Sequence, residues 1–214
     1  MIRFRVAATS NPNTPHLPPQ KTMLLKILFI SVVSAACVNS LAFNPATARR
    51  SVARFTDAPV ASAVVDAALE AAILAPNHFL SEPWRFYIPG EKTMKALNEL
   101  NPEKTKMFEK VPNWLIVTLK SEQELHSKLW LEDLSAVSCA TQNFMTSLAI
   151  DGVGSKWMTG ALGSPPAAIL ETVKAGEGEE LVAAVWFGMP EKGLEGTKAP
   201  PRKLGVEGCL TRLD

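Results

Sequence analysis

Residues 133–150 carry the strongest helical pattern in the chain and limit the folds available to it. Large apolar side chains recur at steps of three and four along one side: Leu134, Val137, Phe144 and Leu148. Small side chains lie between them and permit another helix to approach closely. Asp133 is expected to cap the start or to favour its positive end, and Asp151-Gly152 ends the pattern.

Three apolar runs predict strands, and one of them is central. Residues 84–88 are rich in aromatic side chains and end at Pro89-Gly90. Residues 181–187 form a similar run that ends at Gly188. Residues 114–119 are almost entirely apolar, which predicts a strand that is buried on both faces.

The remaining segments predict helices and loops. A helix over 62–75 begins at Ser62, which can cap it, and ends because Pro76 cannot continue it. Helical signals return in three further segments: 91–110, 122–131 and 165–174. Residues 152–160 are rich in glycine and are interpreted as a connection. Residues after 190 are interpreted as loop.

The first 42 residues have a character of their own, because no Asp or Glu occurs before Asp57. A short basic start, an apolar stretch at 27–38 and small residues at Ser40 and Ala42 are typical of a secretory signal peptide. An uncleaved membrane anchor is the alternative. Phe43, after the expected cut, resembles the start of plastid transit sequences in algae with complex plastids.

We therefore expect a targeting leader at 1–42 and a folded domain at 43–214. The leader would direct the protein into the secretory route or to a plastid. A misassigned first exon would instead leave the protein cytoplasmic.

Composition argues against several kinds of chemistry. The net charge of +1 gives no sign of a nucleic-acid partner. Three widely spaced cysteines predict neither a disulfide framework nor a metal site, and the three histidines lack the spacing of metal ligands. The chain has no nucleophile elbow and no phosphate-binding P-loop. We predict no catalytic side chain, so a cofactor would carry the chemistry of an enzyme of this kind.

Residues 49–55 place three arginines and a serine within seven positions: Arg49, Arg50, Ser51 and Arg54. Arginine presents a planar fork of donors that matches phosphate oxygens in pairs. Charge runs are also often solvated surface. The residues alone leave both interpretations open.

Several short motifs follow one another in order between residues 48 and 205. They are Arg49-Arg50-Ser51-Val52, Phe55-Thr56-Asp57, Ala75-Pro76-Asn77-His78, Pro83-Trp84-Arg85-Phe86, Gly154-Ser155-Lys156-Trp157-Met158-Thr159-Gly160, Val185-Trp186-Phe187-Gly188 and Pro201-Arg202-Lys203. In this order they resemble the FMN-dependent nitroreductase family. The Pro-Asn-His loop and the Lys-Trp-Met-Thr-Gly stretch are most similar to its minimal NAD(P)H nitroreductase branch.

The resemblance implies an α+β fold with a mainly antiparallel central sheet flanked by helices. Two chains would wrap into an intertwined homodimer with FMN in two interface sites. The implied enzyme is an FMN-dependent oxidoreductase that works by a ping-pong mechanism. NADH or NADPH would give a hydride to flavin N5, and a nitroaromatic, quinone or similar small molecule would then accept it.

The resemblance also assigns cofactor-binding residues by position. The FMN phosphate and ribityl chain would contact Arg49, Arg50 and Ser51, with Arg202 reaching the phosphate from the tail. The partner chain would flank the flavin with Pro76, Asn77 and His78. The ring would lie along Trp157, Met158 and Thr159.

Two positions depart from the family pattern. Ala53 stands where many members have a basic residue, and Glu82 where many have glutamine. A carboxylate near the flavin ring would repel the reduced flavin, which is an anion, unless a cation such as Arg85 paired with the carboxylate. These departures keep a second hypothesis open, a non-catalytic or degenerate FMN-binding dimer. It would be tethered to a membrane only if the leader stayed uncleaved.

Overall fold

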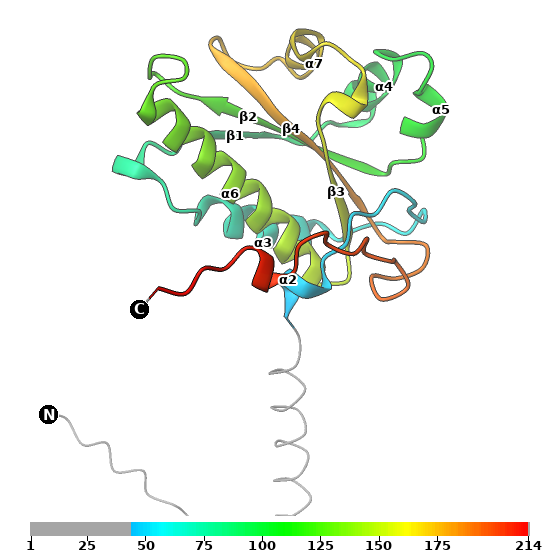
Figure 1. Cartoon of the computed structure of the whole chain (residues 1–214). Coiled ribbons are helices and arrows are strands. Elements are labelled where there is room, and N and C mark those ends of the chain that lie inside the picture. The colour runs from blue at the N-terminus through cyan, green and yellow to red at the C-terminus, as the bar shows by residue number, and fades with distance from the viewer. Residues whose placement is uncertain (1–43, 214) are drawn as a thin grey trace, which may run out of the picture. The chain divides into compact units, whose positions relative to one another are not determined.

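A four-stranded antiparallel sheet forms the middle layer of the protein (Figure 1). Its strands lie in the order β1, β2, β4, β3, and their bounds are Trp84–Tyr87, Asn113–Lys120, Glu179–Gly188 and Gly154–Met158. This is a computed structural model of the chain that describes residues 44–213. The leader predicted at 1–42, with Phe43, lies outside the described residues. Within 44–213 no helix is both long enough and apolar enough to span a membrane.

Helices cover both faces of the sheet. One face packs against α3 (Ser62–Ile73) and α6 (Lys128–Ile150), and the other against α4 (Glu91–Glu99), α5 (Thr105–Phe108) and α7 (Pro166–Val173). Short elements complete the chain: α2 (Pro45–Ala48), η1 (His78–Leu80), η2 (Gly160–Leu162) and η3 (Val206–Gly208). The predicted antiparallel sheet flanked by helices is therefore confirmed.

Strand β2 is the centre of the core, as its apolar sequence predicts. Leu115, Val117 and Leu119 pack on the side of α3 and α6. Trp114 and Ile116 pack on the opposite side, against residues of α4, α5 and α7. Because successive side chains of a strand point to opposite faces, one apolar run supplies two separate cores.

Helix α6 begins earlier than its sequence pattern predicts. Ser127 caps it by accepting a hydrogen bond from the Trp130 backbone N–H at 3.2 Å, so the expected start at Asp133 is wrong. Asp133 lies inside the helix and is buried. Its carboxylate accepts hydrogen bonds from the hydroxyl groups of Ser81 and Ser121, each at 2.7 Å. The carboxylate therefore fastens two loops to the helix instead of capping it.

Two other predictions of where a helix begins are wrong. Ser62 does not cap α3, because Ala61 occupies the N-cap position and makes no side-chain bond. The signal at 122–131 is helical only from Lys128 onward. Local patterns thus placed these helices near their observed positions but misjudged how they begin.

Residues 154–158 form strand β3, so the interpretation of this segment as a connection is wrong. A Cβ on Gly154 would lie 2.6 Å from Val52 Cγ2, which is closer than two carbons can approach. Glycine is needed here because Val52 packs directly on the strand. The Val52 backbone N–H donates to the Ser155 carbonyl oxygen at 3.0 Å, and Ser51 pairs with Ser155 in a parallel bridge.

Replacing Gly154 by alanine should therefore destabilise the protein. The added methyl group would push against the buried Val52 side chain, and overpacking of this kind costs about 1–3 kcal/mol. We expect a lower midpoint of thermal unfolding for Gly154→Ala. Gly205→Ala is the matched control, because a Cβ at Gly205 meets nothing within 4 Å. Equal midpoints for the two variants would contradict the close approach.

Replacing Asp133 by alanine should loosen the two loops that it holds. The variant would leave the Ser81 and Ser121 hydroxyls without their acceptor, at a cost of about 1–3 kcal/mol in unfolding free energy. Hydrogen exchange should rise in the loop that contains Ser81 before it rises in strand β2. Unchanged exchange in that loop would show that Asp133 does not fasten it.

Candidate functional site

Arg49 and Arg50 follow α2 directly, and the backbone of this short helix positions them. The Arg49 backbone N–H donates to the Pro45 carbonyl oxygen at 2.9 Å. Arg50 Nη1 donates to the carbonyl oxygens of Thr47 and Arg49. The Nε atoms of Arg49 and Arg50 are buried and have no hydrogen-bond partner. Two buried cationic donors therefore lie at this point with capacity to spare.

Arg202 joins this cluster from the tail of the chain. Burial, and then the neighbouring Arg202 and Arg50 guanidinium groups, lower the pKa of Arg49. In the described part of the chain, none of the three arginines forms an ion pair with a carboxylate. Positive charge is thus concentrated without compensation, and a dianion such as a phosphate monoester would relieve the repulsion. The residues present fit the phosphate of a nucleotide cofactor.

Strand β3 brings a second predicted group beside the arginine segment. Ser51 pairs with Ser155, and Trp157 and Met158 follow along the same strand. Met158 is buried in the core. Trp157 is half-buried and Thr159 is exposed. The Ser155 hydroxyl is buried and has no hydrogen-bond partner, as is found where a further group completes a site.

The Pro76–His78 loop is held in an unusual conformation. The Asn77 side chain donates to the Ala75 carbonyl oxygen at 3.3 Å and accepts from the Glu82 N–H at 3.0 Å. The next residues, Phe79 and Leu80, have positive φ angles of 55° and 53°, which residues other than glycine rarely adopt. They are exposed by 82% and 79%. The loop therefore holds two apolar side chains out toward solvent.

A pocket of about 420 Å³ lies beside this loop. Its walls are Pro76, Asn77, His78, Glu132, Ser135, Ala136 and Cys139. His78 Nδ1 lies 2.5 Å from Glu132 Oε2, and this contact orients the ring. The residues contributed by α6 were missed by sequence reasoning. Their spacing of three, four and seven positions from Glu132 is the signal that places them on one helical face.

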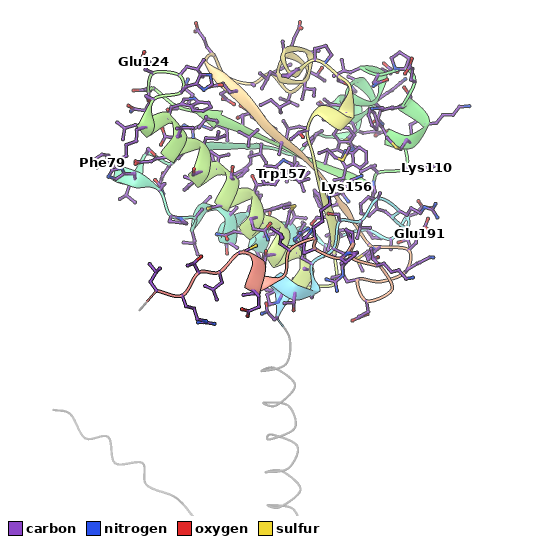
Figure 2. All side chains as sticks on the ribbon, viewed as in Figure 1. Phe79, Lys110, Glu124, Lys156, Trp157 and Glu191 are labelled. Carbon is purple, nitrogen blue, oxygen red and sulfur yellow. The ribbon has the colours of Figure 1, made fainter. Side chains whose placement is uncertain are left out.

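Within one chain the two groups lie far apart. Figure 1 shows η1 near the beginning of α6 and α2 near its end. A helix of 23 residues is about 34 Å long at 1.5 Å per residue. Figure 2 likewise shows Phe79 well separated from Lys156 and Trp157. One chain therefore does not bring the Pro76–His78 loop to the arginine cluster.

The structure also shows the surroundings of Glu82 and Ala53, the two positions that depart from the family pattern. Arg85 Nη1 donates to the backbone carbonyl oxygens of Glu82 and Trp84, at 3.0 and 2.6 Å, and not to the Glu82 carboxylate. Arg85 therefore does not pair with the Glu82 carboxylate in this structure. Ala53 is exposed and lines a cleft together with Arg54.

Comparisons with known proteins agree with this architecture. A model of the nitroreductase family matches residues 46–112. The Bacillus subtilis protein named Putative NAD(P)H nitroreductase YfhC is 28% identical over 170 residues, which cover 72% of this chain and 86% of that protein.

Two solved structures show the same fold. A nitroreductase-like family protein from Bacillus cereus has a TM-score of 0.66 and 24% identity, covering 80% of this chain and 95% of its own. The NADPH:FMN oxidoreductase from Vibrio harveyi, solved with NAD⁺, has a TM-score of 0.67 and 16% identity, covering 80% and 78%. By its motif order, its sheet and these relatives, the chain resembles the nitroreductase family, and it is similar to short NAD(P)H nitroreductases such as the Bacillus subtilis protein.

Proposed function

We propose that this protein is an FMN-dependent oxidoreductase that uses NADH or NADPH to reduce a nitroaromatic, a quinone or a similar small molecule. The single observation that carries the proposal is the cluster of Arg49, Arg50 and Arg202, which concentrates charge without a carboxylate partner. The NADPH:FMN oxidoreductase among the structural neighbours supports it.

The three arginines would hold the FMN phosphate, with Ser51 beside the ribityl chain. The backbone at Trp157–Thr159 would lie along the ring and offer donors to it. When bound, the flavin supplies hydride transfer between the nicotinamide and the acceptor. The chain's own role is to bind, to orient and to place positive charge, and no side chain acts as a nucleophile.

A homodimer would bring the separated groups together. In this proposal the Pro76–His78 loop of the partner subunit flanks the flavin that the arginine cluster holds. Two observations support this arrangement: the loop lies far from the cluster of its own chain, and it exposes Phe79 and Leu80. Residues 134–150 of α6 contain no charged residue, which suits packing against a second copy.

A second candidate function is favoured by one observation. The Glu82 carboxylate is exposed and Arg85 does not neutralise it. If this carboxylate lies near the flavin, it repels the negative charge of reduced FMN. The protein would then bind FMN without catalysing its reduction. The two candidates differ in whether bound flavin accepts electrons.

The purified protein should therefore be yellow, and its flavin absorbance should bleach when NADH or NADPH is added without oxygen. Adding a quinone should restore the colour, because the reduced cofactor passes its electrons on. Bound flavin that resists both reductants would favour the non-catalytic candidate. A colourless protein that does not bind added FMN would contradict both.

Replacing Arg49 and Arg50 together by alanine should weaken FMN binding at least tenfold. Charge-assisted hydrogen bonds contribute about 1.5–3 kcal/mol each, and about 1.4 kcal/mol is a factor of ten. The dissociation constant can be measured by quenching of flavin fluorescence. Lys92→Ala with Lys106→Ala removes the same charge from exposed positions of α4 and α5 and should leave the constant unchanged. Equal constants for the two double variants would mean that the phosphate lies elsewhere.

A further inference from the structure

A second group of cations lies around a cleft of about 330 Å³. Its walls are Val52, Ala53, Arg54, Glu191, Lys192, Gly196, Thr197 and Lys198. Three cations thus face a single carboxylate, and none of the three makes an ion pair with any residue between 44 and 213. The arginines of the first cluster do not line this cleft, so it is a separate positive site.

The loop that carries the two lysines is held by its own hydrogen bonds. The Glu191 backbone N–H donates to the Arg54 carbonyl oxygen at 3.2 Å, which fastens the loop beside the arginine segment. The Thr197 hydroxyl donates to the Gly193 carbonyl oxygen at 2.9 Å and closes the turn between the lysines. The cations therefore project from a defined frame, which reduces the entropy lost when a ligand binds.

The basic cleft continues into a wider one of about 770 Å³, because both are lined by Ala53, Arg54 and Glu191. The wider part adds Phe55 and Thr56, the carboxylates of Asp57 and Glu109, and the ammonium group of Lys110. Figure 2 shows Lys110 and Glu191 on the same side of the molecule. Together they form a groove of the size of small-molecule sites. A free phosphate would leave the wide part empty, whereas a nucleoside with a phosphate monoester would occupy both.

We propose that this groove binds the adenosine end of NADPH. The 2′-phosphate lies among Arg54, Lys192 and Lys198, and the adenosine lies in the wider part. A phosphate monoester is close to a dianion at neutral pH and relieves the repulsion among three cations, which NADH cannot do because it lacks this group. The inference rests on the proposed function and gives it a direction, NADPH in preference to NADH.

The test measures binding of NADP⁺ and NAD⁺ to the full chain by calorimetry, because these two molecules differ only in the 2′-phosphate. NADP⁺ should bind about tenfold or more tightly than NAD⁺. Lys192→Gln with Lys198→Gln should bring the two affinities within about twofold, by weakening NADP⁺ alone. Lys92→Gln with Lys106→Gln removes the same charge from exposed positions elsewhere and should keep the preference.

A titration with FMN separates the two possible sources of the phosphate. The Lys192 and Lys198 double variant should bind FMN as the unchanged protein does, since the flavin phosphate belongs to Arg49, Arg50 and Arg202. If that variant loses FMN instead, the groove holds the flavin phosphate and the inference is overturned. Equal affinity of the unchanged protein for NADP⁺ and NAD⁺ would also overturn it.

Anaerobic bleaching of the flavin separates this inference from the proposed function. Equal bleaching efficiency with NADH and NADPH, together with equal dinucleotide affinity, would sink the inference and leave the oxidoreductase proposal standing. Preferential NADP⁺ binding with no bleaching by either reductant would contradict the oxidoreductase proposal and leave the binding site for the 2′-phosphate standing.

Discussion

The contact between Val52 and Gly154 is the constraint on which the rest of the site depends. It lets the segment after α2 pair with β3, and this pairing fixes where Arg49, Arg50 and Ser51 lie relative to the sheet. The tail and the loop after β4 then pack against the same segment, bringing Arg202 beside Arg49 and Glu191 beside Arg54. Because Gly154 has no Cβ, residues that are far apart in the sequence can lie together on one charged surface.

The sequence predicted the layers of the fold well, because they follow from periodic burial. The apolar run at 114–119 predicts a central strand, and the apolar side of 134–148 predicts a helix face covered by other elements. Prediction from the sequence failed where one residue type is compatible with two structural roles. Gly154 is read as flexible in a sequence, yet here its small size admits a neighbour into a strand. Asp133 has the properties of a helix cap, yet it is a buried acceptor for two serines.

The candidate site was only partly open to prediction for a related reason. Arg49, Arg50 and Ser51 are adjacent, so their shared chemistry is visible in the sequence. Glu132 and Cys139 enter the pocket beside His78 because α6 turns one face toward that loop. Lys192 and Lys198 lie in a tail with no periodicity, and only the turn closed by Thr197 places both on one cleft. Long-range geometry of this kind leaves no local pattern to read.

The outward-facing Phe79 and Leu80 have a consequence for the protein in a cell. Both residues have a left-handed backbone and are largely exposed, so a single chain presents an apolar surface to water. Newly made chains would be most prone to aggregate through this surface before the homodimer that we propose has formed. The amount of folded protein would then depend on how fast chains are synthesised as well as on how tightly each is packed.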